Sequence, residues 1–261
     1  MSKTRQVRGT LRRGFHVRTF STDLPVPRVI PRHTHEQHQL VYASTGVITV
    51  RTDRGMWVVP SHRAVWMPAG MEHEIETSGF VAMRTLYLDA ELSDGFPSQC
   101  IVVSVSPLLR ELILQACRIG VLNGANAEHA RLIAVLIDQM HVLPTVAFQL
   151  PLPLDPRAQR AARTILSAPG DESSIDEICR QAGASRRTLE RLFFSETGMT
   201  TGMWRQQARV LRALQLLGAG HNVTSVALDV GYSGTSAFVA MFKKAIGTTP
   251  GAYARRKASR V

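Results

Sequence analysis

The stretch IDEICRQAGASRRTLERLF, from Ile175 to Phe193, is followed by a second stretch of the same design, VTSVALDVGYSGTSAFVAMF, from Val223 to Phe242. Each stretch has a small residue four positions before a glycine, and later a large apolar residue and a phenylalanine. In order, these residues are Cys179, Gly183, Leu189 and Phe193 in the first stretch, and Ala227, Gly231, Phe238 and Phe242 in the second. The small residue lets two helices cross closely, and the glycine permits a tight turn between them. The repeat therefore predicts two helix-turn-helix units, the geometry that presents a helix to the major groove of DNA.

Charge favours the same function. The chain has 261 residues with a net charge of +11. From Asp155 onward there are 16 basic and 8 acidic residues, so this shorter part carries +8 and the remainder only +3. A basic segment of this kind suits a polyanionic partner. The chain has no apolar run of the roughly 18–20 residues that a membrane span needs, so we expect no membrane partner.

The first recognition helix is predicted from Arg186 to Glu196, with Ser185 as its N-cap and Gly198 just past its end. Leu189, Leu192 and Phe193 must face inward, which leaves the charged residues outside. We expect Arg187 and Arg191 to reach guanine edges, Glu190 to accept from cytosine, and Arg186 to contact phosphate.

The second recognition helix has short outward side chains, which can touch thymine methyl groups or make single hydrogen bonds but cannot make bidentate contacts. We expect it to meet DNA through Ser233, Thr235, Ser236 and Val239, with Lys243 and Lys244 on phosphates. Direct readout should therefore come mainly from the first unit.

Before these helices the chain divides into four parts. Residues 1–18 are basic, with no acid before Asp23, and indicate a disordered tail. Residues 19–105 read as short strands, including a hairpin of 47–50 with 56–59, and predict a small barrel. Residues 106–143 hold two amphipathic helices, with apolar stripes at Leu108–Ala116 and Leu132–Met140 that form core or pair two chains. Four prolines in 144–156 indicate a linker to a helical domain at 157–261. The fold class is thus α+β with two domains.

The C-terminal hundred residues resemble the AraC/XylS family of transcription regulators. The resemblance rests on the double motif, on Arg191-Leu192-Phe193 with Glu196-Thr197-Gly198, on Gly231-Tyr232-Ser233, and on a closing signature of Gly247, Pro250 and Tyr253. Many members of the family carry arginine where this chain has Ala240, which weakens base reading by the second unit. The resemblance implies an N-terminal sensor domain that binds a small molecule or pairs two chains.

Two short motifs of the N-terminal part resemble those of cupins. His33, His35 and Gln39 lie in H-x-H-x-x-x-Q before Gly46, and His73 ends P-x-G-x-x-H. In metal-binding cupins three histidines and a glutamate hold a divalent transition metal inside the barrel. Gln39 stands in the glutamate position, and a neutral amide oxygen is the weaker ligand.

Three interpretations of these four residues stay open. They hold a divalent transition metal, they line an effector pocket without metal, or they are barrel residues without a ligand. We favour the effector pocket.

Together these patterns predict a cytoplasmic, sequence-specific transcription regulator that binds double-stranded DNA and responds to a small-molecule effector. Three cysteines without paired spacing fit a reducing compartment. We expect a homodimer, with RNA polymerase as a further partner, and no enzymatic activity. The alternatives are a metal-responsive regulator of the same type and a cupin metalloenzyme with a basic appendage.

Overall fold

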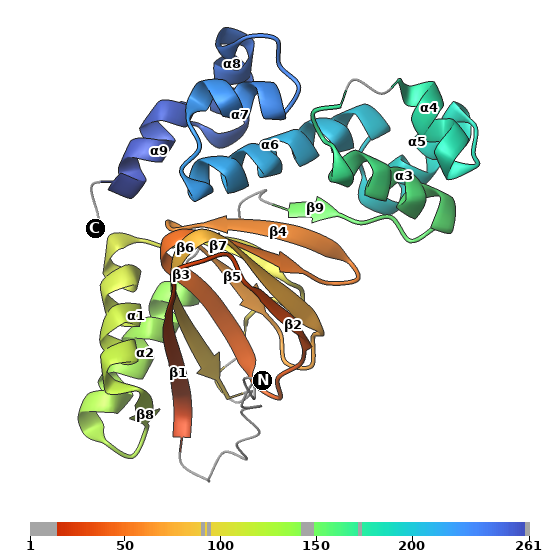
Figure 1. The fold of residues 1–261 in the computed structure, drawn as a ribbon. Helices are drawn as coiled ribbons and strands as arrows, with labels where there is room; N and C mark the ends of the chain where they lie inside the picture. Colours follow the sequence, from red (N-terminus) through yellow and green to blue (C-terminus); the bar gives the residue numbers. More distant parts are fainter. Residues whose placement is uncertain (1–14, 90–91, 93–94, 142–148, 172–173, 259–261) are drawn as a thin grey trace, which may run out of the picture.

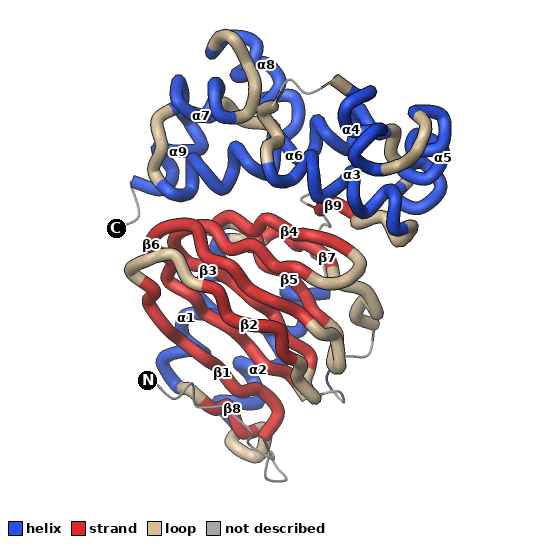
Figure 2. The backbone as a smooth tube through the Cα atoms, turned by 45° about the vertical axis from the view of Figure 1, so that its right-hand side comes forward, coloured by secondary structure: helices blue, strands red, loops and turns tan. Residues whose placement is uncertain are grey.

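A computed structural model describes residues 15–89, 92, 95–141, 149–171 and 174–258. A bent β-sheet with two helices against it forms the N-terminal part, and helices alone form the C-terminal part, which lies across one side of the sheet (Figures 1 and 2). The N-terminal strands are β1 (Phe15–Leu24), β2 (Val29–His33), β3 (His38–Arg51), β4 (Gly55–Pro60), β5 (Arg63–Met67), β6 (His73–Leu88) and β7 (Ile101–Ser104). The predicted hairpin is confirmed as β3 paired with β4.

Two long strands, β3 and β6, lie side by side along most of their length and carry the rest of the sheet. The first half of β3 pairs with β5 and its second half with β4, while β6 pairs first with β2 and then with β1. The register shifts around Gly46, which has φ +89, and a Cβ there would lie 2.3 Å from the carbonyl oxygen of Phe80. Such an irregularity bends the strand and turns the sheet.

The pairing stops short of the barrel that we predicted. Within the described residues β7 pairs with β5 alone, and β8 (Val121–Asn123), a strand that we did not predict, pairs with β1 alone. Both are therefore edges of a bent, open sheet.

Strand alternation gives the sheet two different apolar faces. Leu40 and Tyr42 of β3 pack outward under helices, whereas Val41 and Ala43 point to the inner face of the bend. Because both faces are covered, the strands read as nearly continuous apolar runs.

Helices α1 (Pro107–Ile119) and α2 (Ala127–His141) are the two amphipathic helices that the sequence predicted. The inward positions of their stripes are core: Leu109, Ile113 and Leu136 are buried against the outer face of the sheet. The idea that these stripes pair two chains is therefore wrong at the buried positions, since Leu136 is only 1% exposed in a single chain.

The segment predicted as a linker takes part in the sheet. Residues 142–148 lie outside the described residues, but β9 (Gln149–Pro151) pairs with β4, and Leu150 is fully buried. A three-residue strand that pairs on one side tolerates a proline at its end.

The predicted tail also differs, because β1 begins at Phe15 and Val17 is buried in the core under α1 and α2. Residues 1–14 of that tail lie outside the described residues.

The C-terminal part is helical, as predicted. Its helices are α3 (Pro156–Ser167), α4 (Ile175–Ala182), α5 (Arg186–Thr197), α6 (Thr201–Ala219), α7 (Val223–Asp229), α8 (Thr235–Ile246) and α9 (Pro250–Ala258). Gly183 and Gly231 form the two turns with φ +66 and +81, and Ser185 caps α5 as predicted. Helix α6 runs through Gly218 and ends at a cap on Gly220.

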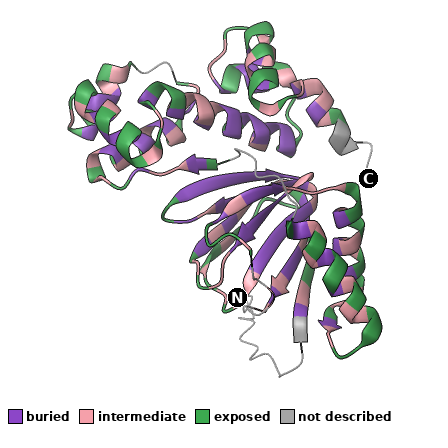
Figure 3. Cartoon of the chain, turned by 180° about the vertical axis from the view of Figure 1, so that it is seen from behind, coloured by how far each residue is buried: buried purple, intermediate pink, exposed green. Residues whose placement is uncertain are grey.

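Helix α6 joins the two parts of the molecule. One continuous apolar cluster includes the inner-face residues of the sheet and the buried residues of α3 to α9. Figure 3 shows buried residues along the sheet and along much of α6. Gln215 Nε2 donates to Thr49 Oγ1 at 2.8 Å, and Trp204 Nε1 donates to the carbonyl oxygen of Pro151 at 2.7 Å. The helical part is therefore docked on the sheet. Among the described residues, no helix is long and apolar enough to cross a membrane.

Candidate functional site

Three histidines meet at the inner face of the sheet. His33 of β2 lies opposite His73 of β6, on the same side as Ile75 and the rest of the inner-face core, and His35 comes from the loop before β3. The His33 ring centroid is 4.8 Å from that of His35 and 4.3 Å from that of His73, and the His35 and His73 centroids are 5.4 Å apart. Each ring offers one nitrogen, and these three nitrogens lie within 4.8 Å of one another. We call these three residues the histidine cluster.

Backbone carbonyl groups orient two of the rings. The Nδ1 atoms of His33 and His73 lie 2.7 Å from the Pro31 carbonyl oxygen and 2.9 Å from the Met71 carbonyl oxygen. A carbonyl oxygen can only accept, so in each neutral ring Nδ1 carries the proton and Nε2 keeps a lone pair. Nε2 of His35 and Nε2 of His73 are buried without a hydrogen-bond partner among the described residues.

Burial keeps His35 and His73 uncharged. Together with charge repulsion from the neighbouring His33, it lowers the pKa of His35 and of His73 to about 4. At neutral pH these two rings are therefore neutral, and each keeps a lone pair that can accept a hydrogen bond or bind a cation.

Gln39 and Tyr87 complete the surroundings of the cluster. They face each other across β3 and β6, and Gln39 Nε2 donates to the Tyr87 hydroxyl at 3.2 Å. The Tyr87 ring lies 4.9 Å from that of His35, and burial raises the pKa of Tyr87. Gln39 Oε1 is buried with no partner among the described residues. No sequence motif points to Tyr87, and only its register opposite Gln39 could have identified it.

The bend of β6 makes this meeting possible. A straight strand would separate His73 from Tyr87 by about 45 Å. In the bent sheet both rings lie beside His35, so opposite ends of one strand supply one site.

The first helix-turn-helix unit exposes three arginines on α5. Arg186, Arg187 and Arg191 are all exposed, whereas Leu189 is buried. Glu190 differs from expectation, because its Oε2 accepts from the backbone N–H of Thr201 at 3.1 Å, in the first turn of α6. Its carboxylate therefore stabilises the start of α6, where the helix dipole favours negative charge.

The second unit exposes shorter side chains. Ser233, Ser236, Lys243 and Lys244 are exposed, while Thr235 and Val239 are half-buried. Gly234 occupies the N-cap of α8 and gives no side-chain hydrogen bond to the first turn. The backbone N–H groups of that turn are thus left for other acceptors.

The two units are held together by the loop after α3. A Cβ on Gly170 would lie 2.2 Å from the carbonyl oxygen of Asp229, and one on Gly231 would lie 2.4 Å from the carbonyl oxygen of Gly170. Arg209 of α6 donates to the Pro169 carbonyl oxygen at 2.9 Å, and its guanidinium lies over the Tyr232 ring. The loop between α3 and the first unit therefore touches the turn of the second unit.

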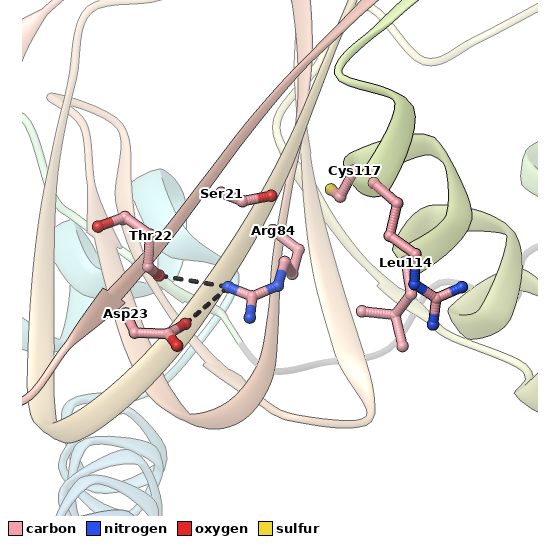
Figure 4. A pocket seen from close by; sticks show the side chains of 7 residues that line it. Ser21, Thr22, Asp23, Arg84, Leu114 and Cys117 are labelled. Atoms are coloured by element: carbon pink, nitrogen blue, oxygen red, sulfur yellow. Dashed lines mark hydrogen bonds and ion pairs between the residues drawn. The ribbon is translucent and has the colours of Figure 1, made fainter.

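A separate cleft of about 490 Å³ lies between the outer face of the sheet and α1 (Figure 4). In this cleft Arg84 donates to Asp23 Oδ1 at 2.8 Å and to the Thr22 carbonyl oxygen at 3.4 Å. The other lining residues are Ser21, Leu114, Cys117 and Arg118. No sequence motif points to this cleft, which lies on the other face of the sheet from the histidine cluster.

Comparison with known proteins gives two family matches. Residues 15–143 match the AraC-like ligand binding domain, and residues 178–256 match a helix-turn-helix domain. The HTH-type transcriptional regulator NimR of Escherichia coli is 34% identical over 226 residues, which cover 87% of this chain and 82% of NimR. RipA of Corynebacterium glutamicum, also an HTH-type transcriptional regulator, is 35% identical over 40% of this chain and 31% of RipA. Among solved structures, ToxT from Vibrio cholerae aligns with 92% of this chain and 98% of its own chain, with 10% identity and a TM-score of 0.39.

Proposed function

Because the chain belongs to the AraC family of helix-turn-helix transcriptional regulators, we propose which residues read its operator and where its effector binds. Arg187 and Arg191, four residues apart on α5, read bases, and Arg186 contacts phosphate. Their exposure on a helix whose opposite side is buried is the observation that carries this assignment. An arginine at a base edge can grip guanine through two hydrogen bonds.

The second unit makes weaker base contacts. Ser233, Thr235, Ser236 and Val239 offer single hydrogen bonds and apolar contacts, and Lys243 and Lys244 bind phosphates. The uncapped first turn of α8 adds donors for a phosphate oxygen. Glu190 we now place outside the base-reading set, since its carboxylate already binds the Thr201 N–H.

The effector pocket in this proposal is the histidine cluster with Gln39 and Tyr87. Its polar atoms are buried, converge from β2, β3 and β6, and include acceptors without a partner among the described residues. Buried polar groups of this kind fix the orientation of a small ligand. The pocket also lies near the docked helix α6. Thr49 accepts a hydrogen bond from Gln215 of α6. Thr49 also pairs with Glu76 of β6, which is three residues after His73.

An effector changes operator binding only if it binds one arrangement of the chain better than another. The contact between the sheet and α6 supplies a surface whose arrangement an effector can change. We propose that the regulator acts in the cytoplasm, where the chromosome lies, with RNA polymerase as a partner and without enzymatic activity. Pairing of two chains stays a proposal, and it has to use exposed residues such as Leu108 and Val135, because stripe positions such as Leu109 and Leu136 are buried in the single chain.

Genome-wide footprinting of the bound chain tests the proposal. We expect discrete sites that share a two-part sequence motif, and genes beside those sites indicate the effector class. With that effector, His73→Ala should abolish the change in operator affinity. Uniform binding along the chromosome would show that the reading helices are misassigned. A response to the effector that is lost in Arg84→Ala but kept in His73→Ala would show that the pocket is misassigned.

A further inference from the structure

The histidine cluster has a feature that a pocket for an organic molecule does not need. Its three rings come from two separate places in the chain, His33 and His35 from one short motif and His73 from another, and their nitrogen atoms lie within 4.8 Å of one another. Among the described residues, buried ring nitrogens of His35 and His73 have no hydrogen-bond partner. We propose that His33, His35 and His73 bind one divalent transition-metal ion and that Gln39 Oε1 is the fourth protein ligand. This inference names the class of ligand for the proposed effector pocket. Only the effect of the metal on DNA binding rests on the proposed function.

The hydrogen bonds of the rings match what a metal requires. A metal-bound imidazole usually donates its second N–H to a carbonyl or carboxylate group, which fixes the tautomer and the ring orientation. The carbonyl groups of Pro31 and Met71 do this for His33 and His73. The Nε2 atoms that remain are lone-pair donors, and those of His35 and His73 have no other partner among the described residues.

The spacing is close to that of a bound site. Nitrogen atoms that share one zinc ion at about 2.1 Å lie about 3.4 Å from one another. The cluster nitrogens lie within 4.8 Å of one another. Each ring therefore has to move by less than about an ångström, a shift that side-chain rotation supplies.

The donor set indicates which ions bind. Imidazole suits zinc, copper, nickel, cobalt and iron, whereas magnesium and calcium prefer oxygen ligands. All four protein ligands here are neutral, so the ion keeps its full charge. An ion with uncompensated charge binds less tightly than in a site with a carboxylate, and it attracts an anionic group to any remaining coordination position.

The test uses the full chain without a polyhistidine tag, stripped by a chelator and titrated with Co²⁺ and Zn²⁺. We expect one ion per chain, visible Co²⁺ absorption typical of nitrogen ligands, and displacement of Co²⁺ by Zn²⁺. His33→Ala and His73→Ala should each weaken binding by tenfold or more.

His38→Ala is the matched control, because His38 belongs to the same sequence segment but accepts from the Ala69 N–H and stacks on Trp66. It should bind metal as the unaltered chain does. Gln39→Glu adds the missing negative charge and should tighten binding. Because His33 is only half-buried, His33→Ala should fold, which circular dichroism verifies.

A folded chain that takes up no ion, or that loses binding equally in His33→Ala and His38→Ala, would overturn the metal site. The operator measurement is separate. Metal binding that leaves operator affinity unchanged would overturn the effector role of this pocket and leave the metal site in place.

Discussion

Gly218 of α6 lies so close to Val47 of β3 that a Cβ on the glycine would come within 2.2 Å of Val47 Cγ2. The helix that connects the two DNA-reading units thus approaches the sheet of the sensor domain at backbone distance. Val47 lies at the bend of β3, beside Gly46, so one region of the chain shapes the sheet and receives the helix.

Gly218→Ala should force α6 away from the sheet. Overpacking of this kind costs about 1–3 kcal/mol. Gly202→Ala is the control, because Gly202 also lies in α6 but a Cβ there would meet no heavy atom of the described residues within 4 Å. Urea unfolding of both variants measures the difference. Equal free energies of unfolding in the two variants would mean that the close approach of α6 to the sheet does not affect stability.

Arg191→Ala should relax sequence choice at one operator position, at a cost of about 1–3 kcal/mol there, while Lys244→Ala should weaken all DNA binding and lower the salt slope by about 1. Competition assays with single-base operator variants measure the first effect, and titrations at several salt concentrations measure the second. Arg131→Ala, at an exposed position of α2, removes one charge from the other domain and is the control. An equal loss of specific and random binding in Arg191→Ala would remove that residue from the base-reading set.

Glu190→Ala should destabilise the protein by about 0.5–2 kcal/mol, because the Thr201 N–H loses its acceptor, and Glu190→Gln should restore part of that loss. Base preference should stay the same in both variants. Thermal unfolding and the single-base competition assay give the two readouts. If Glu190→Gln changes preference at a cytosine position, the residue reads DNA after all.

Leu136→Ala should cost about 2–5 kcal/mol, since it removes a buried side chain between α2 and the sheet. Val135→Ala, at the neighbouring but 40% exposed position, should change stability by less than about 0.5 kcal/mol. Denaturant unfolding compares them. If Leu136→Ala left the free energy of unfolding unchanged and altered only the molecular mass measured by light scattering, the stripe would be a surface between two chains after all.

Acid should destabilise the metal-free protein. In the unfolded chain a histidine has a pKa of about 6.5, whereas in the folded chain His35 and His73 have pKa values of about 4. Between these values the unfolded state binds more protons, so the free energy of unfolding is highest above pH 6.5 and decreases as the pH falls toward 4. Urea unfolding with a chelator at pH 7 and pH 5 should show this decrease. His73→Gln should reduce it and the exposed His221→Gln should not, and identical pH profiles for both variants would contradict the assignment.

Short-range patterns predicted the helical half well. The turns at Gly183 and Gly231 and the cap at Ser185 depend on residues a few positions apart, and all three are confirmed. The histidines of two short motifs also come together, because the motifs lie at strand ends that the bend joins.

Contacts between distant segments escaped prediction for a physical reason. The role of Gly218 depends on Val47, which lies 171 positions earlier in the chain, and Tyr87 is identified only by its partner across two strands. The pairing of β9 with β4 occurs within a proline-rich segment whose local preference is against a sheet. In each of these three pairs, the residues next to one member in the sequence contain no information about the other member.

The contact of Gly170 with the turn at Gly231 has a consequence for how target sites evolve. Backbone atoms meet on both sides of that contact, so the turn of the second unit packs tightly against the loop that precedes the first. A contact of this kind favours one separation and one rotational phase of the two recognition helices. An insertion of about 5 base pairs between their targets would turn the second target to the opposite side of the DNA. Binding sites for this regulator should therefore drift in base sequence, above all under α8, while their length and internal spacing stay constant.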